Sequence, residues 1–187
     1  MTEREKMLAG ELYDPGDPEL VRLRLTMRQL CQAYNNLPPE DEAGHDRLRL
    51  RMFGAHREYA YMEPPVWFDY GVNISVGEHF YANFGLTVLD SAPVVIGDHV
   101  QIGPNVEMYT ATHPLEPAAR ATGLEFGKPG RIGNHVRIGG HTVINPGVTI
   151  GDNPVIGSGS VVTRDIPAGV LAAGNPCRAI RKIVERL

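Results

Sequence analysis

An apolar side chain returns at every sixth position through most of residues 68–166 of this 187-residue chain. Helices repeat about every 3.6 residues and strands about every 2, so neither element alone gives this spacing. A coil with three flat faces does, if each face is a short strand plus a corner and the repeated side chain points inward. Stacked coils bury these side chains as one continuous ladder, so the spacing predicts a β-solenoid. A sandwich of short strands is the alternative, which the strict spacing disfavours.

The repeat contains one phase slip and one long interruption. Its lead positions are Phe68, Ile74, Phe80, Leu86, Ile96, Ile102, Met108, Ile132, Ile138, Ile144, Ile150, Ile156 and Val162. Nine of these thirteen are Ile or Val in a chain that is 42% hydrophobic, so chance does not explain the pattern. The interruption covers 114–131. A loop of this length that leaves a rigid solenoid is typical of a functional element.

His113 ends the last complete repeat before the interruption. The following Pro114 favours an extended backbone at His113 and fixes the direction in which the chain leaves the solenoid. A neutral imidazole, with a reference pKa of about 6.5, can take a proton from an alcohol near neutral pH. His113 is therefore a candidate general base, and an ordinary loop histidine is the alternative at this point.

The sequence predicts helices at both ends of the chain. In residues 1–60, the predicted helical cap, Thr2 and Glu5 have the spacing of a capping box, Asp17 precedes Pro18 as an N-cap, and a third segment covers about 40–58. Residues 61–175 form the predicted solenoid with its excursion at 114–131, and residues 176–187 are predicted as a C-terminal helix. The expected fold class is mainly β.

Composition narrows the range of partners and compartments. The net charge is −4 and the pI is about 6.0, so there is no basic surface to bind nucleic acid or an anionic membrane. The N-terminus lacks the apolar segment of a signal peptide, and no apolar run is long enough to cross a bilayer. Cys31 and Cys177 read as free thiols, with a disulfide between them as the alternative. We therefore expect a cytoplasmic protein.

The segment "IGNHVRIGGHTVINPGVTIGDNPVIGSGSVVTRDIP" resembles the left-handed parallel β-helix of hexapeptide acyltransferases. The stretches "MLAGELYDPGDPEL", "EPPVWFDYGVNISVGEHFYANF", "TATHPLEPAAR", "LEFGKP" and "AAGNPCRAI" narrow the resemblance to the maltose/galactoside O-acetyltransferase branch. The left hand of the helix comes from this resemblance alone. The resemblance implies acetyl transfer from acetyl-CoA to a sugar hydroxyl without a metal. It also implies a homotrimer with active sites between adjacent subunits.

The resemblance also suggests residues for the acceptor side. It assigns His113 as the base, and it places Asn83, in "YANF", near both the acetyl group and the acceptor. Asp69 and Asp90 match acceptor-side positions, although solvated corner carboxylates are the simpler alternative for both. Glu125 returns on the excursion, where it could bind sugar hydroxyls or orient the imidazole.

The coenzyme-binding residues implied by the resemblance are Asn83, Gly140, Ser158, Thr163, Arg178 and Arg181. The Gly140 amide could face the thioester oxygen, since glycine allows close approach to the backbone. Arg178 and Arg181 are three residues apart, so a terminal helix would place them on one face for coenzyme A phosphates. A solvated basic helix is the alternative for this pair.

Two other functions compete with sugar acetylation, and a non-catalytic solenoid scaffold is a further alternative, which the placement of His113 and Glu125 around the excursion disfavours. The first is the same transfer to a non-sugar acceptor, such as an antibiotic, an amino acid or an amino sugar. The second is a zinc enzyme of the γ-carbonic anhydrase type, which needs three converging histidines. His99 and His135 could share a face, but we expect no third histidine with a matching phase, since His113 and His141 fall on other faces or places. One departure from the branch concerns the coenzyme channel: Arg137 stands where Trp is very common.

Overall fold

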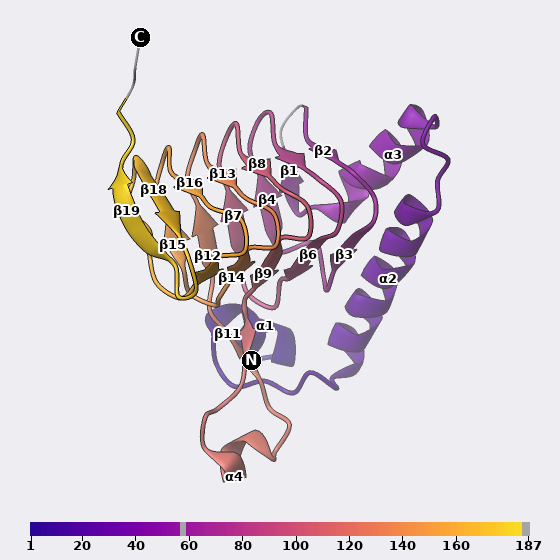
Figure 1. Cartoon of the computed structure of the whole chain (residues 1–187). Coiled ribbons are helices and arrows are strands. Elements are labelled where there is room, and N and C mark those ends of the chain that lie inside the picture. The colour runs from indigo at the N-terminus through magenta and orange to yellow at the C-terminus, as the bar shows by residue number, and fades with distance from the viewer. Residues whose placement is uncertain (57–58, 185–187) are drawn as a thin grey trace.

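The computed structural model describes residues 1–56 and 59–184. Its main body is a solenoid in which short strands stack into three sheets (Figure 1). The first sheet contains β1 (Ala55–His56), β4 (Ile74–Val76), β7 (Val94–Ile96), β12 (Gly130–Ile132) and β15 (Thr149–Ile150). The second contains β2 (Tyr61–Met62), β5 (Tyr81–Ala82), β8 (Gln101–Ile102), β13 (Arg137–Ile138), β16 (Val155–Ile156), β18 (Val170–Ala173) and β19 (Arg178–Lys182). The third contains β3 (Val66–Phe68), β6 (Leu86–Leu89), β9 (Glu107–Tyr109), β14 (Val143–Ile144) and β17 (Val161–Val162).

The sixfold repeat marks the core, as predicted. All thirteen lead residues are buried, and none is more than 5% exposed. They belong to one continuous apolar cluster that also includes Val100, Val106, Val136 and Val148 from the fifth positions of the repeat. The inward residues of successive coils are therefore in register, as in the parallel pairing of Ile138 with both Ile102 and Ile156.

The interruption does not disturb the stacking of the coils. β7 pairs directly with β12, with Val94 opposite Gly130 and Ile96 opposite Ile132, although the excursion lies between them in the sequence. The excursion leaves and re-enters through a two-stranded antiparallel stem, β10 (Ala111–Thr112) and β11 (Phe126–Gly127), with the short helix α4 (Pro117–Arg120) at its tip. In Figure 1 this arm projects below the solenoid.

Three helices precede the solenoid: α1 (Glu3–Ala9), α2 (Pro18–Asn35) and α3 (Glu42–Met52). The predicted capping box is present at Thr2 and Glu5, and the Asp17 side chain accepts hydrogen bonds from the first turn of α2. The inner face of α2 adds Met27, Cys31 and Tyr34 to the solenoid core. Figure 1 shows α2 and α3 covering the first coils. Within the described residues, no helix has the length and apolar character needed to span a membrane.

Two predicted boundaries are wrong. The third helix ends at Met52, and Ala55–His56 already form β1 of the solenoid; residues 57 and 58 lie outside the described part. The predicted C-terminal helix is wrong over Arg178–Lys182, which form β19, antiparallel to β18. The physical reason is that β18 ends the stack with unpaired backbone groups, and a returning strand satisfies them. Residues 185–187 of that predicted helix are not described.

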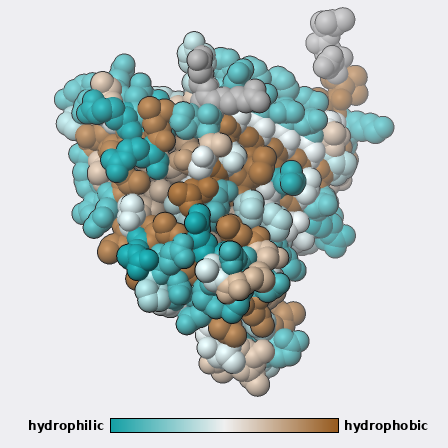
Figure 2. Space-filling view, turned by 180° about the vertical axis from the view of Figure 1, so that it is seen from behind, coloured by the Kyte–Doolittle hydropathy of each residue, from teal (hydrophilic) through white to brown (hydrophobic). Residues whose placement is uncertain are grey.

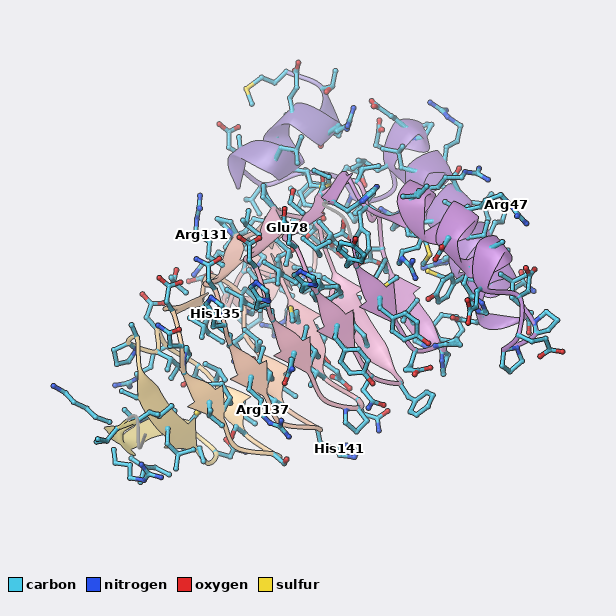
Figure 3. All side chains as sticks on the ribbon, turned by 90° about the horizontal axis from the view of Figure 1, so that it is seen from above. Arg47, Glu78, Arg131, His135, Arg137 and His141 are labelled. Atoms are coloured by element: carbon cyan, nitrogen blue, oxygen red, sulfur yellow. The ribbon has the colours of Figure 1, made fainter. Side chains whose placement is uncertain are left out.

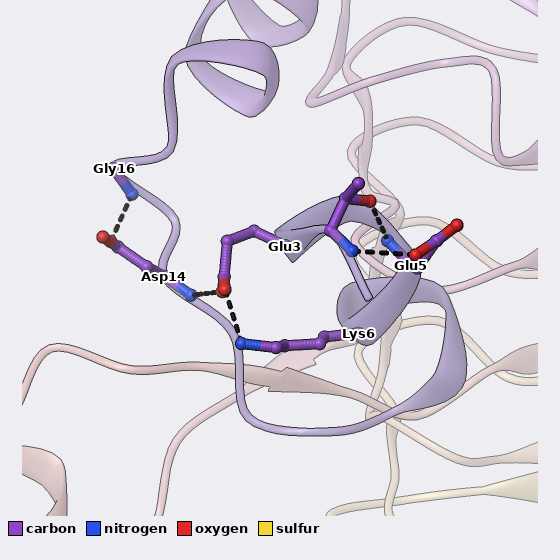
Figure 4. A network of polar contacts seen from close by, with 6 residues as sticks. Glu3, Glu5, Lys6, Asp14 and Gly16 are labelled. Carbon is purple, nitrogen blue, oxygen red and sulfur yellow. Dashed lines mark hydrogen bonds and ion pairs between the residues drawn. The ribbon is translucent and has the colours of Figure 1, made fainter.

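A polar network fixes the segment between α1 and α2 (Figure 4). Glu3 accepts hydrogen bonds from the Lys6 ammonium and from the backbone N–H of Asp14, each at 2.6 Å. The Asp14 side chain in turn accepts from the N–H of Gly16 at 2.8 Å. Because these contacts lie next to Tyr13, they help to hold that residue against the base of the arm.

Candidate active site

The stem of the arm brings His113 and Glu125 together. Ala111 pairs with Gly127 and Thr112 with Phe126, so the next position of the same antiparallel register places His113 opposite Glu125. His113 Nε2 lies 3.8 Å from Glu125 Oε1. This distance is longer than a hydrogen bond, but a small side-chain movement would close it. The His113 side chain is about half exposed, so a substrate can reach it.

Tyr13 holds Glu125 from the other side. The backbones of the two residues exchange hydrogen bonds, from Tyr13 N to Glu125 O at 2.9 Å and from Glu125 N to Tyr13 O at 3.1 Å. The Tyr13 hydroxyl also donates to Glu125 Oε2 at 2.9 Å. Burial, followed by the nearby Glu125 carboxylate, raises the pKa of Tyr13 above its usual range. The phenol therefore stays protonated and remains a hydrogen-bond donor.

A cavity of about 230 Å³ lies beside this pair, where α2 meets the solenoid. Its lining residues are Tyr13, Pro15, Arg24, Arg28, Asp69, Tyr70, Ser91 and Glu125. Asp69 and Glu125, both predicted for the acceptor side, therefore face the same space. Burial raises the pKa of Asp69, while Arg24 and Arg28 oppose that shift. Such a cavity can accept hydroxyl groups, because carboxylates accept hydrogen bonds and guanidinium groups donate them.

Asp90 occupies a supporting place rather than a place on the cavity surface. Its side chain is fully buried and accepts hydrogen bonds from the backbone N–H groups of Tyr70 at 2.8 Å and Asn73 at 3.3 Å. Burial raises the pKa of Asp90 to about 7, although the backbone hydrogen bonds oppose the shift. Asp90 lies in the phase slip between Leu86 and Ile96, and it braces the turn that carries Asp69.

The six predicted coenzyme residues lie in three places. A groove of about 520 Å³ on the second sheet is lined by Tyr81, Asn83, Gln101, Ile102, Gly103, Pro104, Arg137, Ile138, Gly139, Gly140 and Ser158. Three predicted residues, Asn83, Gly140 and Ser158, are thus brought together. Thr163 is not: it is exposed beyond β17, at the end of the third sheet.

Glycine is required along this groove because successive coils approach closely there. A Cβ at Gly103 would lie 2.6 Å from the nitrogen of Gly140, and one at Gly139 would lie 2.5 Å from the nitrogen of Ser158. These distances are shorter than any ordinary contact, so larger residues would force the coils apart. The groove floor is consequently made of backbone, which an extended ligand can approach closely.

Arg178 and Arg181 lie at the far end of the same sheet, on β19. Arg178 pairs with Ala173, and a bulge shifts the register so that Arg181 pairs with Leu171. The helix that was predicted to align them is absent, but both arginines still lie on one exposed strand. From β5, which precedes Asn83, to β19 there are five strand spacings, or roughly 24 Å.

His113 and the groove belong to different faces of the chain. His113 leaves the solenoid after β9 of the third sheet, whereas the groove runs along the second sheet. Asn83 and Asp69 were both predicted near the acceptor, yet Asn83 lines the groove and Asp69 lines the smaller cavity. The predicted site residues of one chain therefore lie in two separate places.

The histidines at one corner of the solenoid form a stack rather than a metal site. The rings of His79 and His99 lie 4.7 Å apart, and those of His99 and His135 lie 4.8 Å apart and nearly parallel. The prediction that no third histidine joins His99 and His135 is wrong, because His79 stacks on His99 at the same corner. Within residues 1–56 and 59–184, no group of three or more His, Cys, Asp or Glu side chains is placed to hold a metal ion.

Sequence reasoning also missed Tyr13, Arg24 and Arg28. The two arginines are one helical turn apart on α2, which reads as an ordinary polar face. In the structure, Arg24 donates to the Tyr70 hydroxyl and to the Pro15 carbonyl, each at 2.5 Å. The i, i+4 spacing of the arginines was visible, but the sequence did not show that this face meets Asp69.

Comparisons with known proteins agree with this architecture. Residues 6–57 match the family model "Maltose acetyltransferase hexapeptide capping motif", and residues 129–164 match "Bacterial transferase hexapeptide (six repeats)". The galactoside O-acetyltransferase of Escherichia coli K12 is 47% identical over 100% of this chain and 92% of its own length. A solved maltose O-acetyltransferase from Clostridium difficile 630 has a TM-score of 0.95 at 45% identity and covers 99% of both chains. A galactoside acetyltransferase solved in complex with coenzyme A also has a TM-score of 0.95, at 47% identity, and covers 98% of this chain and 92% of its own. The chain therefore belongs to the hexapeptide acyltransferases, in the maltose/galactoside O-acetyltransferase branch.

Proposed function

We propose that this protein transfers the acetyl group of acetyl-CoA to a hydroxyl of a sugar of the maltose, glucose or galactoside type. The observation that carries the proposal is His113 opposite Glu125 beside a cavity of carboxylates and guanidinium groups. The glycine-floored groove supports the coenzyme part of the proposal. The relatives named for maltose and galactoside acetylation support the choice of acceptor.

In this mechanism, His113 takes the proton of the sugar hydroxyl as the hydroxyl oxygen attacks the thioester carbonyl. The amide N–H of Gly140 donates a hydrogen bond to the oxygen that gains negative charge. The carbon–sulfur bond then breaks, and the imidazolium returns its proton to the departing thiolate. Glu125 steadies the ring in its cationic form, and Asp69 and Glu125 accept hydrogen bonds from neighbouring sugar hydroxyls.

The acetyl group passes directly to the acceptor, without a covalent enzyme intermediate. Cys31 and Cys177 are both buried, and burial raises the pKa of each thiol. A thiol of this kind is a poor nucleophile, because the thiolate is the reactive form.

Both cysteines are free, which supports a reducing compartment and hence the cytoplasm.

We place the complete active site between adjacent subunits of a homotrimer. The reason is that His113 and the groove lie on different faces of one chain, so a neighbour must bring the second half-site. The arm also exposes apolar surface: Leu115 is 86% exposed, and Figure 2 shows hydrophobic residues on the projection at the bottom of the molecule. Such surface is typical of a region that another subunit covers.

The first experiment measures acetyl-CoA consumption with maltose, glucose and galactosides for the wild type and His113→Ala. Loss of a general base lowers kcat by about 10²- to 10⁴-fold. The substitution should leave folding intact, since His113 is half exposed and its charge contact is 3.8 Å long. A folded His113→Ala enzyme with nearly full kcat would refute the assignment, and acetylation of none of these sugars would refute the acceptor class.

The second experiment tests the shared site. His113→Ala and Asn83→Ala subunits, each inactive alone, are unfolded together and reassembled. Mixed trimers should regain part of the activity, because some interfaces combine an intact His113 with an intact Asn83. Light scattering reports the oligomeric state. A monomeric active enzyme, or mixtures that stay as inactive as either parent, would contradict the shared site.

A further inference from the structure

Arg137 lies in the middle of the groove on the second sheet. Its strand, β13, is flanked by β8 and β16, with Arg137 opposite Gln101 on one side and Val155 on the other. The side chain is exposed, and it lines the groove together with Gly139, Gly140 and Ser158. In Figure 3, Arg137 and His141 project from one side of the solenoid, whereas Glu78 and Arg131 lie on the opposite side.

The guanidinium group of Arg137 has no protein partner within the described part of the chain. Among the residues that line the groove, it is the one charged side chain; the others are apolar, glycine, or neutral polar groups such as Asn83 and Gln101. Other exposed arginines of the described residues, such as Arg131, likewise have no hydrogen-bond or ion-pair partner there, so the place in the groove is what distinguishes Arg137. Five N–H donors of Arg137 are therefore directed to the groove or to solvent without a fixed acceptor.

The place of Arg137 along the groove limits what it can bind. It lies on the same coil as Gly140, whose amide faces the thioester oxygen in the proposed mechanism. Asn83 follows β5, two strand spacings away, or about 10 Å, and Arg178 begins β19, three spacings away on the other side, or about 14 Å. Arg137 thus stands between the acyl end and the phosphate end of the coenzyme that the groove is proposed to hold.

We propose that Arg137 forms an anion subsite that recognises an oxyanion carried by the acyl-coenzyme A substrate. A planar guanidinium binds phosphate or carboxylate oxygens in a forked, bidentate manner, and such charge-assisted hydrogen bonds are strong. Two groups of the substrate have this chemistry: a phosphate of coenzyme A, and the terminal carboxylate of a dicarboxylic acyl group such as succinyl. The proposal rests on the assignment of the groove to the coenzyme, and the experiment separates these two sources.

The first experiment measures binding by calorimetry on the wild type, Arg137→Gln and Arg137→Lys. The ligands are coenzyme A and pantetheine, which has no phosphate. If a coenzyme phosphate is the partner, Arg137→Gln should weaken coenzyme A binding at least tenfold and leave pantetheine binding unchanged. Arg137→Lys should retain part of the affinity, because lysine keeps the charge and loses the fork. Arg131→Gln is the matched control: it removes an exposed arginine from β12 of the same coil, outside the groove.

The second experiment measures turnover and compares acetyl-CoA with succinyl-CoA for the same variants. If the acyl carboxylate is the partner, coenzyme A binding stays constant while kcat/KM for succinyl-CoA relative to acetyl-CoA falls at least tenfold in Arg137→Gln. The inference is overturned if Arg137→Gln changes neither quantity by more than twofold. It is also overturned if the substitution weakens pantetheine as much as coenzyme A.

Together, the binding and turnover experiments test this inference separately from the proposed function. A wild type that binds coenzyme A through Arg137 but acetylates no sugar would refute the acceptor class and support the anion subsite. Normal sugar acetylation with an Arg137→Gln enzyme that behaves as the wild type would do the reverse. A wild type that does not bind coenzyme A would refute both.

Discussion

Replacing Tyr13 with phenylalanine removes one hydroxyl group and leaves an aromatic ring in a buried place. That hydroxyl donates to Glu125 Oε2 at 2.9 Å, whereas the backbone bridge between the two residues does not depend on it. Glu125 therefore stays opposite His113 but loses the contact that orients its carboxylate. The substitution therefore tests whether the orientation of the Glu125 carboxylate affects catalysis by His113.

The structure sets the expected magnitude. A hydrogen bond to a charged group contributes about 1.5–3 kcal/mol to stability. The Glu125 side chain is 25% exposed, so water can partly replace the lost donor, and we expect the free energy of unfolding to fall by about 1.5 kcal/mol. If the misoriented carboxylate withdraws a similar amount of support from the His113 cation in the transition state, kcat falls about tenfold. KM for acetyl-CoA should not change, because Tyr13 lies outside the groove.

Urea unfolding followed by circular dichroism gives the stability change, and steady-state kinetics with the best sugar acceptor gives kcat and KM. Glu125→Gln is the companion variant, since it keeps an acceptor for the Tyr13 hydroxyl and removes the charge. Tyr109→Phe is the control, because the Tyr109 hydroxyl has no hydrogen-bond partner among the described residues. Unchanged stability and kcat in Tyr13→Phe would refute the reasoning, as would a raised KM for acetyl-CoA with kcat intact.

Three other predictions concern the core and the groove. Burial raises the pKa of Asp90 to about 7, so the folded chain binds a proton there that the unfolded chain has released, and stability should fall as pH rises from about 4 to about 7. Between pH 5 and pH 8 the free energy of unfolding should fall by about 3 kcal/mol in the wild type and by less in Asp90→Asn. Gly103→Ala places a methyl group 2.6 Å from the Gly140 nitrogen, so it should destabilise the fold by about 1–3 kcal/mol and weaken coenzyme A binding. An unchanged affinity for coenzyme A in calorimetry would contradict this. Ile138→Ala opens a cavity in the inner ladder and should lower the free energy of unfolding by about 2–5 kcal/mol, whereas the outward Val95→Ala should change it by less than about 1.

The local sequence predicted that the arm exists but not how its two strands pair. The end of the sixfold repeat at His113 and its return at Ile132 predicted a rigid solenoid with an inserted segment, and the parallel pairing of β7 with β12 confirms this. The antiparallel stem, which sets His113 against Glu125, was not predicted, because its register depends on pairing across the arm. Tyr13 joins the pair from more than a hundred residues away, so no local pattern could have identified it.

What the sequence determined by itself is the periodic part of the protein. Each lead residue must point inward once coils of one length stack, and each N-cap depends on side chains within three or four residues, so both can be read locally. Tertiary structure decided the rest. Burial turned Asp90 from a possible ligand contact into a brace for the turn that carries Asp69. The open edge of β18 made a strand of Arg178–Lys182, and the three faces of the solenoid separated His113 from Asn83. These outcomes depend on which groups are buried, which hydrogen-bonding groups lack a partner, and which face of the solenoid carries each residue. All three are properties of the whole fold, and the spacing of residues in the sequence does not contain them.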